Sequence, residues 1–428
     1  ADSRSFADGE GFTAKDDFVS YLPPAWITEQ WLAFGCHLLS GGTINFAENA
    51  ETQREDVREI APSVVVYTSR LWESEASEVL AKMGSAGRLK RWATHWAMPV
   101  GRRAADAYHS KQRLSWQWKL LNLPADLVAF RPMRDHMGLP HARACYTSGS
   151  TLATDTTLLF HSLKVPLKNV YGSAEAGAVT GAAKGGQIPG TVGSVNQGVE
   201  LRFSEQGEIQ VRHSGMFLGY LDGSAAGPDK LADGWVATGD LGELTPDGDL
   251  VFIDRGQDLI PLPCGDVVPP QTVESTLKSS AYIKDAWVHA EQGCDWLSAI
   301  IIVDAANTGH WADKAKVAFT TFGDLSQKPE VYDLIRGEIE RLNKGLPATR
   351  RIARYVNLHK EFDPDEQELT RNRKLRRSYL KERYAGLAHA LSGQDDSVEV
   401  EAEFTYQDGR VGKIKTTLRI ATIGRGEA

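Results

Sequence analysis

The pattern that most constrains this fold is an alternation of helix-like and strand-like segments over the first 171 residues. Residues 26–39, for example, carry four large apolar side chains at helical spacing: Ile27, Trp31, Phe34 and Leu38. We expect helices at residues 26–39, 51–60, 70–82, 125–137 and 155–163, and strands at 43–46, 63–67, 142–146 and 168–171. Helices and strands in turn indicate a sheet with helices on its faces, so the expected fold class is α/β.

The pattern changes after residue 190. Short alternating strands, such as residues 208–212, are separated by turns and predict a small β subdomain up to residue 255. Beyond it the pattern is mixed, with expected helices at 272–279 and 330–344 and expected strands at 283–289 and 297–303. Residues 398–423 alternate, turn at Asp408-Gly409 and alternate again, which predicts a β-hairpin. We interpret this hairpin as a docking or oligomer element.

Residues 83–124 are the least regular part of the chain. They contain four tryptophans scattered among basic residues: Trp92, Trp96, Trp116 and Trp118. We expect helices that pack by their aromatic faces and prefer this interpretation to a ligand channel.

Composition excludes several classes of protein. The 428 residues, 42% hydrophobic and 24% charged, suffice for two or three globular domains. The net charge of −8 and the absence of a long basic block argue against nonspecific nucleic-acid binding. The four cysteines (Cys36, Cys145, Cys264 and Cys294) show no paired spacing, which favours reduced thiols in a cytoplasmic protein. The sequence has neither a signal peptide nor an apolar run long enough to span a membrane.

Four short segments occur in a fixed order along the chain: Tyr171-Gly172-Ser173-Ala174-Glu175, Thr238-Gly239-Asp240, Asp254-Arg255 and Leu369-Thr370-Arg371-Asn372-Arg373-Lys374. Together they resemble the AMP-forming adenylating enzymes, which activate a carboxylate as an acyl-adenylate. Further segments are similar to the long-chain fatty acyl-CoA synthetase branch: Tyr21-Leu22-Pro23, Ala25-Trp26-Ile27, Glu29-Gln30, residues 40–46, Asp258-Leu259-Ile260 and Leu375-Arg376-Arg377. The likeness extends from about residue 18 to about residue 390.

The resemblance implies four segments: residues 1–189, the α/β part of a large adenylate-forming domain without its N-terminal portion; 190–255, the β subdomain; 256–392, a smaller mobile α+β lid domain; and 393–428, the appended hairpin. Family members carry a loop ending in Pro-Lys-Gly that wraps the ATP phosphates, and no such loop precedes Tyr21. We therefore expect this chain to start downstream of it. Residues 146–151 are similar to that loop but lack its Gly-x-Pro-Lys ending. By resemblance, Gly149, Ser150 and Thr151 instead line the adenine pocket.

The resemblance also implies roles in the large domain. Glu175 would hold a Mg²⁺ ion that bridges the phosphates, since Mg²⁺ commonly takes one or two protein carboxylates. Tyr171 and Gly172 would contact adenine, with Ser173 and Ala174 beside them in the nucleotide site. Asp240 would accept hydrogen bonds from the two ribose hydroxyls. Arg255 would add a planar set of donors at the ribose and phosphate side.

In the lid domain, Lys374 would bridge the substrate carboxylate and the α-phosphate. The family rotates its lid between the two half-reactions, which implies a hinge at Gln257 and a CoA passage lined by the loop around Gly265. ATP, Mg²⁺ and coenzyme A are the implied cofactors and cosubstrate, and a fatty acid is the implied substrate. Such a substrate also allows association with a bilayer surface, and a homo-oligomer or a complementary N-terminal segment would be a further partner.

Three features of the sequence depart from the family pattern. Ala174 replaces a threonine, Gln257 replaces a charged residue, and a pair of prolines, Pro261 and Pro263, stiffens the CoA loop and removes backbone donors. The sequence therefore leaves three functions open: a fatty acyl-CoA ligase that forms acyl-CoA, AMP and diphosphate; a nucleotide- or acyl-binding module with little turnover; and an acyl-AMP ligase that serves a carrier protein.

Overall fold

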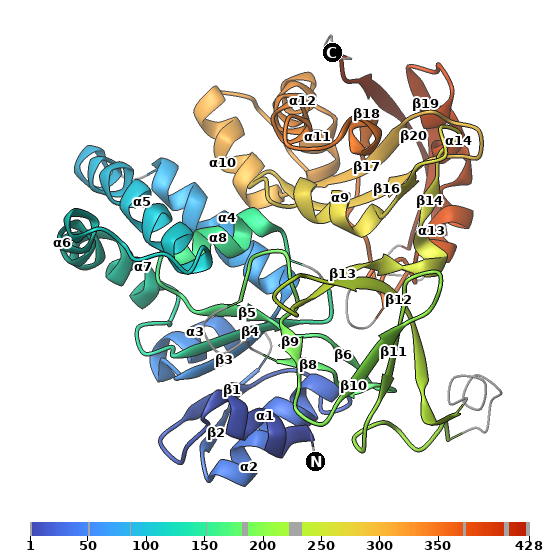
Figure 1. Cartoon of the computed structure of the whole chain (residues 1–428). Helices are drawn as coiled ribbons and strands as arrows, with labels where there is room; N and C mark the ends of the chain where they lie inside the picture. The colour runs from blue at the N-terminus through green and yellow to red at the C-terminus, as the bar shows by residue number, and fades with distance from the viewer. Residues whose placement is uncertain are drawn as a thin grey trace. The chain divides into compact units, whose positions relative to one another are not determined.

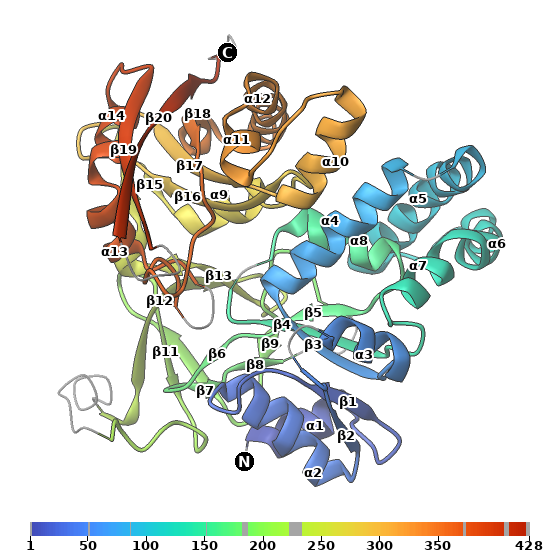
Figure 2. The same cartoon turned by 180° about the vertical axis from the view of Figure 1, so that it is seen from behind.

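The computed structural model describes residues 2–49, 52–85, 87–150, 152–181, 187–221, 233–370, 374–405 and 411–424. The chain forms two compact units, Ala1–Gly256 and Gln257–Ala428 (Figures 1 and 2). The predicted fold class is confirmed, because the first unit is built on a parallel sheet covered by helices and the second is a smaller α+β unit. The finer division into four segments stays a prediction.

The main sheet of the first unit has five parallel strands in the order β2-β1-β3-β4-β5. They are β1 (Asp17–Ser20), β2 (Thr43–Phe46), β3 (Val64–Thr68), β4 (Ala144–Ser148) and β5 (Leu167–Asn169). Four of these strands were predicted within two residues, because each is a short apolar or β-branched run between turn residues. The four-residue strand β1 was not.

Helices cover both faces of this sheet. On one face, α1 (Asp2–Glu10) and the π-helix η1 (Glu29–Cys36) pack on alternate strand residues: Phe18, Val64, Val66, Ala144 and Tyr146. The other face presents the intervening residues Val19, Val65, Tyr67, Cys145 and Leu167. They pack with residues of α3 (Gln53–Ile60), α4 (Ser69–Ser85), α5 (Arg88–His109), η2 (Asp126–Phe130) and α8 (Thr154–Ser162). Burial on both faces is typical of a parallel sheet and explains its apolar strands.

Two predicted helices are divided in the structure. Residues 26–39 form η1 followed by α2 (His37–Ser40), and residues 125–137 form η2 followed by α7 (Arg131–His136). The irregular stretch forms α5 and α6 (Trp116–Ala125), which pack against each other. The predicted packing by aromatic faces holds for Trp96 and Trp118, which contact the core. It is wrong for Trp92 and Trp116, which are 65% and 69% exposed.

The predicted β subdomain is a four-stranded antiparallel sheet in the order β10-β11-β12-β13. Its strands are β10 (Glu200–Phe203), β11 (Glu208–Arg212), β12 (Val236–Leu244) and β13 (Leu250–Arg255). Four short strands form two further antiparallel pairs: β6 (Gly172–Ser173) with β7 (Gly177–Ala178), and β8 (Thr180–Gly181) with β9 (Ser194–Val195). Its core includes Ile209, Val211 and Val236, together with Tyr171 from the end of the parallel sheet. This shared core holds Tyr171, two residues after β5, against the antiparallel sheet.

The second unit contains a five-stranded sheet in the order β16-β17-β18-β20-β19. The strands are β16 (Ile283–His289), β17 (Leu297–Val303), β18 (Ile352–Asn357), β19 (Ser397–Thr405) and β20 (Val411–Thr422). One face packs against α9 (Pro270–Leu277), α10 (Ala305–Ala315), α11 (Phe322–Gln327) and α12 (Pro329–Asn343), and the other packs against α13 (Arg377–Arg383) and α14 (Ala385–Ser392).

The C-terminal hairpin is part of that sheet. Strands β19 and β20 pair antiparallel from Ser397↔Arg419 to Thr405↔Val411, and β20 also pairs with β18 through Val356↔Ile420. The predicted turn at Asp408-Gly409 lies outside the described residues. A docking or oligomer role for the hairpin stays a prediction.

Two further sequence expectations concern cysteines and membrane spans. All four cysteines are unpaired, and Cys264 alone among them is exposed. Within the described residues, none of the helices combines the length and the apolar composition that crossing a bilayer demands.

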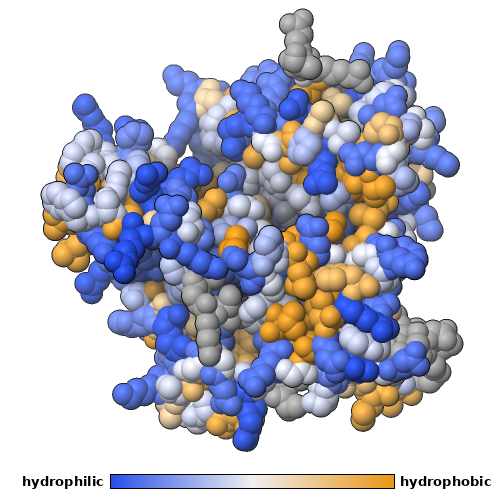
Figure 3. All heavy atoms as spheres, viewed as in Figure 1, coloured by the Kyte–Doolittle hydropathy of each residue, from blue (hydrophilic) through white to orange (hydrophobic). Residues whose placement is uncertain are grey.

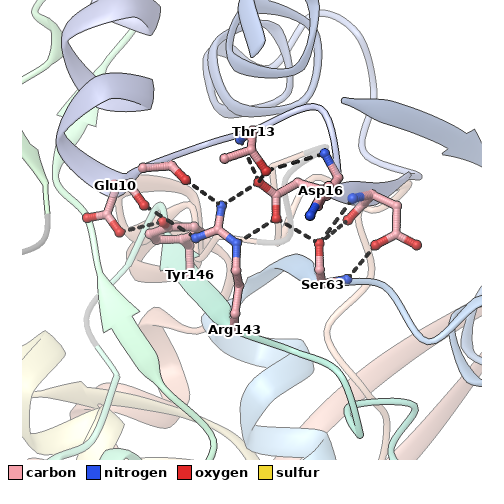
Figure 4. Close-up of polar contacts among 9 residues, drawn as sticks. Glu10, Thr13, Asp16, Ser63, Arg143 and Tyr146 are labelled. Carbon is pink, nitrogen blue, oxygen red and sulfur yellow. Dashed lines mark hydrogen bonds and ion pairs between the residues drawn. The ribbon is translucent and has the colours of Figure 1, made fainter. Parts of the chain in front are cut away.

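A polar network ties the first helix to the amino ends of the strands (Figure 4). Arg143 Nε and NH2 donate to the two carboxylate oxygens of Asp16 at 2.5 and 2.6 Å. Asp16 Oδ2 also accepts from the Thr13 backbone N–H at 2.7 Å, and Asp16 Oδ1 accepts from Ser63 Oγ at 3.1 Å. Tyr146 OH and Lys168 Nζ both donate to Glu10 Oε2 at 2.7 Å. The end of α1 and the loop before β1 are thereby joined to β4 and β5.

We expect Arg143→Ala to lower the free energy of unfolding by about 1–2 kcal/mol at pH 7. Burial alone would raise the pKa of Asp16, but hydrogen bonds from Arg143 and Thr13 lower that pKa to about 2. The stabilisation is therefore present above pH 3.8 and is lost as the pH falls through about 2. Urea unfolding at pH 7 and pH 2 measures it, with the exposed Arg4→Ala on α1 as the control. An equal loss at both pH values would contradict this electrostatic explanation.

Candidate functional site

The carboxyl ends of the parallel strands gather polar side chains at one edge of the sheet, where α/β proteins commonly bind ligands. Thr28 and Ser148, the last residue of β4, share a hydrogen bond of 2.9 Å between their hydroxyl oxygens. Ser150 hydrogen-bonds to the hydroxyl of Ser69, where α4 begins after β3. Gly149 lies between Ser148 and Ser150 in the chain and has φ +92°, a left-handed conformation that glycine adopts without strain. The predicted Gly149 and Ser150 thus lie at this edge, and the predicted Thr151 lies outside the described residues.

Tyr171 leads from β5 into a tight hairpin of β6 and β7. Its backbone N–H donates to Thr180 Oγ1 at 2.9 Å, and its carbonyl oxygen accepts from Val179 N and Thr180 N at 3.0 Å. Gly172 follows it, and a Cβ built there would lie 2.3 Å from the carbonyl oxygen of Gly177. A side chain therefore does not fit at residue 172, because the backbone of the paired strand β7 occupies its place.

The turn of this hairpin contains the predicted Ser173, Ala174 and Glu175. Ser173 Oγ accepts from the backbone N–H of Ala176 at 3.0 Å, and Ala174 is exposed. Glu175 is half-buried, and its Oε1 accepts from the hydroxyl of Tyr220 at 2.7 Å. Tyr220 was not predicted as a site residue, because it belongs to an aromatic stretch without a recognisable motif. Its contact with Glu175 depends on a chain reversal of 45 residues.

Tyr171, Asp240 and Arg255 come together although the first two are 69 residues apart. The hydroxyl of Tyr171 donates to Asp240 Oδ2 at 2.7 Å. Asp240 on β12 is the cross-strand partner of Arg255 on β13, and Arg255 Nε lies 3.7 Å from Asp240 Oδ1. Burial, followed by the charge of Asp240, raises the pKa of Tyr171 well above 10. The tyrosine therefore stays protonated at neutral pH and remains a hydrogen-bond donor to the carboxylate.

Two neighbouring contacts hold Asp240 in position on β12. The hydroxyl of Thr238 donates to the carbonyl oxygen of Ile209 at 2.8 Å and accepts from the Asp240 backbone N–H at 3.2 Å. Glu208 Oε1 accepts from the backbone N–H of Gly239 at 2.8 Å, and Gly239 has φ +75°. The Thr-Gly-Asp segment is thus a fixed irregularity in the strand that directs its carboxylate at Tyr171.

Glu29 is a further candidate. It belongs to the Glu29-Gln30 segment, for which no role was predicted. Its side chain lies near the end of β1, where the hydroxyl of Ser20 donates to Glu29 Oε1. The residue is 1% exposed, and Oε2 has no hydrogen-bond partner in the described part of the chain. Burial raises the pKa of this carboxyl to about 7, against the weaker effect of Ser20. The signal available in the sequence was a carboxylate inside an otherwise apolar helical stretch.

The remaining predicted residues belong to the second unit. Lys374 is exposed and directly precedes Leu375, which forms an isolated bridge with Leu369. Its backbone N–H donates to Thr370 Oγ1 at 3.1 Å, and its carbonyl oxygen accepts from Thr370 N at 2.8 Å. Arg377, three residues after Lys374, joins two other motif segments, because its Nε lies 3.5 Å from Asp258 Oδ2. Its Nη1 also donates to Glu274 at 2.8 Å.

Gln257 is the first residue of the second unit, in a single turn of 3₁₀ helix, Gly256–Asp258. Gly265 lies in the turn between β14 (Ile260–Pro261) and β15 (Val267–Val268). It has φ +86°, and a Cβ built on it meets nothing within 4 Å. The boundary between the two units thus falls at the predicted hinge position, and the predicted passage residue lies in an open turn.

The candidate metal ligand is a single carboxylate. Among the described residues, no group of three or more His, Cys, Asp or Glu side chains is arranged to hold a metal ion. One carboxylate nevertheless fits Mg²⁺ when nucleotide phosphates and water supply the other oxygens, which is the usual arrangement for this ion. Glu175 therefore suits a metal that arrives with a nucleotide and does not form a preassembled metal centre.

Comparison with known proteins agrees with this fold. Residues 2–221 match the model of a family described as AMP-binding enzyme. Protein fadD11 of Mycobacterium tuberculosis, whose name assigns it to the fatty-acid–CoA ligases, is 24% identical over 379 residues, covering 88% of this chain and 66% of that protein. Long-chain-fatty-acid–CoA ligase 1 of Schizosaccharomyces pombe is 25% identical over 403 residues, covering 87% and 57%. The chain therefore spans less than two thirds of the length of these relatives.

Solved structures show a similar fold. The adenylation domain of a carboxylate reductase from Mycobacterium chelonae superposes with a TM-score of 0.67 at 18% identity, covering 88% of this chain and 54% of that one. The A domain of a carboxylic acid reductase from Segniliparus rugosus, solved with AMP and a co-purified carboxylic acid, gives 0.64 at 17% identity and covers 91% and 58%. The family match extends over more than half of the chain, so this protein belongs to the AMP-binding enzyme family.

Proposed function

We propose that this chain belongs to an ATP-dependent ligase that activates a fatty carboxylate as acyl-AMP and transfers the acyl group to coenzyme A. The observation that carries this proposal is the cluster of Tyr171, Asp240 and Arg255, which joins three separate motif segments in one unit. Family membership and the fatty-acid–CoA ligase names of the relatives support it.

The cluster suits the nucleoside part of ATP. An ionised carboxylate has about four acceptor positions, so Asp240 can accept from Tyr171 and still accept from two ribose hydroxyls. The tyrosine hydroxyl fixes the carboxylate, and Tyr171 and Gly172 are proposed to contact adenine. Arg255 adds donors beside the ribose. Gly149 and Ser150, at the end of β4, are proposed to line the base pocket.

Activation replaces a poor leaving group by a good one. A carboxylate oxygen attacks the α-phosphorus of ATP, the bond from that phosphorus to the bridging oxygen breaks, and diphosphate leaves. The thiol sulfur of CoA then attacks the acyl carbon, AMP leaves and the thiol proton is released. Catalysis of such steps consists mainly of positioning and charge stabilisation. We propose Lys374 for the cationic role, Gln257 as the hinge and Gly265 in the CoA passage.

Glu175 is the proposed ligand of Mg²⁺, held together with phosphate oxygens and water. When bound, the ion would neutralise phosphate charge. The contact from Tyr220 orients the carboxylate of Glu175. We also propose a cytoplasmic location, which the four unpaired cysteines favour. Self-association and peripheral association with a membrane stay proposals.

A second candidate is a nucleotide-binding module with little turnover. It is favoured by the exposed Ala174, which brings no hydroxyl to the phosphates where the family has threonine. Hydrogen bonds to charged groups contribute roughly 1.5–3 kcal/mol, so this loss alone can slow adenylation. The third candidate, a ligase that serves a carrier protein, uses the same residues.

The functions are separated by measuring diphosphate release with fatty acids, with and without CoA or a pantetheinylated carrier protein. The assay is made on this chain and on a longer chain that includes a phosphate-binding loop. Release that depends on a fatty acid, followed by acyl-CoA formation, is the expected result. AMP binding without release from either chain would favour the binding module, and acyl transfer to the carrier alone would favour the third function.

Asp240→Ala is expected to weaken AMP binding by at least about 100-fold, because two hydrogen bonds to a charged group are lost. Isothermal titration with AMP measures the effect on this chain directly. Glu243→Ala is the matched control, since Glu243 is an exposed carboxylate on the same strand. An unchanged AMP affinity in Asp240→Ala would contradict the assigned ribose contact.

A further inference from the structure

The helices α5, α6 and η2 carry an exposed apolar surface. More than half of the large apolar side chains that are exposed in the described residues lie between Leu89 and Val128. Four of them form a stripe on the continuous helix of α6 and η2, and their exposed fractions are 69%, 65%, 65% and 53%: Trp116, Leu120, Leu123 and Leu127. Their spacing of four, three and four residues puts them on one face. Figure 3 shows hydrophobic residues bordering hydrophilic ones over this group of helices.

The opposite face of the same helix is already packed. Ala125 and Ala129 are buried, and Trp118 contacts the same core. Phe130 continues the spacing of the stripe but is buried, so the exposed part of the stripe ends at Leu127. The helix therefore needs no further apolar residues to hold its position against α5. A helix that is apolar on both faces is normally covered on both. The exposed stripe thus indicates a contact that the described residues do not provide.

The segment that carries the stripe is rich in positive charge. Residues 88–131 contain nine arginines and lysines against two aspartates, a surplus of seven in a chain whose net charge is −8. All nine cationic residues are exposed. Lys119 lies three residues after Trp116 on the same helix, and Arg131 follows Leu127 by four residues. One of the two aspartates, Asp126, is paired with Arg134 at 2.9 Å and with Lys164 at 3.3 Å.

We propose that the stripe of Trp116, Leu120, Leu123 and Leu127, with the cations around it, binds the surface of an anionic lipid bilayer. Tryptophan and leucine on one face, bordered by lysine and arginine, are the features of a helix that lies in the interface plane. The cations meet the negative headgroups while the apolar side chains enter the acyl boundary. A bilayer receives projecting side chains without a matching groove, whereas a protein partner has to supply one.

Co-sedimentation of the whole chain with vesicles tests this proposal. We expect binding to vesicles of phosphatidylcholine with about 30% phosphatidylserine, weaker binding to phosphatidylcholine alone, and a decrease as NaCl rises from about 0.1 to about 0.5 M. The double variant Leu120→Glu/Leu123→Glu is expected to lower the partition coefficient at least about 100-fold. Removing Arg113, Lys119 and Arg131 together as alanines is expected to cost about fivefold for each charge, roughly 100-fold in all.

Leu38→Glu is the matched control, because Leu38 is 75% exposed on α2 and lies outside the stripe. Its binding should stay within about twofold of the parent. The altered positions are exposed, so circular dichroism and thermal melting should be unchanged in all variants. Vesicle binding needs neither nucleotide nor carboxylate, so this inference and the proposed ligase function stand or fall separately.

Three results would overturn the proposal. The first is unchanged vesicle binding by Leu120→Glu/Leu123→Glu, and the second is equal binding of the parent to neutral and anionic vesicles. The third is absence of vesicle binding combined with a parent dimer that the same double variant dissociates in analytical ultracentrifugation. That third result would assign the stripe to a second copy of this chain.

Discussion

Lys374→Ala is expected to slow acyl-adenylate formation by about 100- to 1000-fold, the range found when one donor to a developing charge is removed. Thioester formation from supplied acyl-AMP and CoA should change by no more than a few fold. The difference arises because two anions, the carboxylate and the α-phosphate, approach each other only in the first half-reaction. A lysine ammonium that bridges them offsets their repulsion.

The position of Lys374 makes this test clean. The residue is exposed, and alanine keeps the two backbone contacts with Thr370, so the variant should retain its fold. Lys381→Ala removes another exposed lysine of the same unit, on α13, and serves as the control. Both half-reactions are followed separately, by diphosphate release and by thioester formation, on this chain and on a longer chain. Equal losses in the two half-reactions would rule out the assigned role.

Glu29→Gln is expected to raise the free energy of unfolding by about 3 kcal/mol at pH 8 and to change it little at pH 4. Burial raises the pKa of Glu29 from its ordinary 4.5 to about 7. The folded state therefore binds a proton that the unfolded state releases between these pH values. The contribution of Glu29 to stability is complete below pH 4.5 and is lost as the pH rises through about 7. Glutamine is neutral throughout and does not incur this loss.

Urea unfolding at several pH values between 4 and 8 measures the effect. The parent should lose stability over this range relative to Glu29→Gln, and the two curves should converge at the acidic end. Glu55→Gln, an exposed position on α3, should differ from the parent by less than about 0.5 kcal/mol at every pH. A constant difference between parent and Glu29→Gln across the range would show that the carboxyl does not titrate as its burial implies.

Much of the fold was predictable because buried strands have a local signature. Residues 283–289 and 297–303 were predicted as strands and form β16 and β17 with the same bounds. Strand β17 is buried at every position, so its sequence is apolar except for Ser298. By contrast, β1 (Asp17–Ser20) was missed because its only apolar residues are the adjacent Phe18 and Val19, which show no alternation. Its pairing with β2 and β3 supplies what the sequence lacks.

The candidate site divides in a similar way. Tyr171, Asp240 and Arg255 were chosen from motif segments, and the structure brings all three together. The hydrogen bond from Tyr171 to Asp240 was not predicted, because it depends on the shared core of the β subdomain. The contact between Tyr220 and Glu175 likewise needs the chain to return after 45 residues. Motifs name residue types in order, whereas contacts between them depend on packing.

The sequence by itself determined the alternation of helix and strand, the antiparallel hairpins and the order of the motif residues. These follow from spacing along the chain, because a helix or a strand imposes its period on neighbouring residues. Only the tertiary structure decided that Glu29 is buried and that Trp116 and Leu120 are exposed. Burial depends on which distant segments cover a side chain, and local period carries no information about that. For this reason, the burial of the Glu29 carboxyl and the exposure of the apolar stripe were not predicted from the sequence.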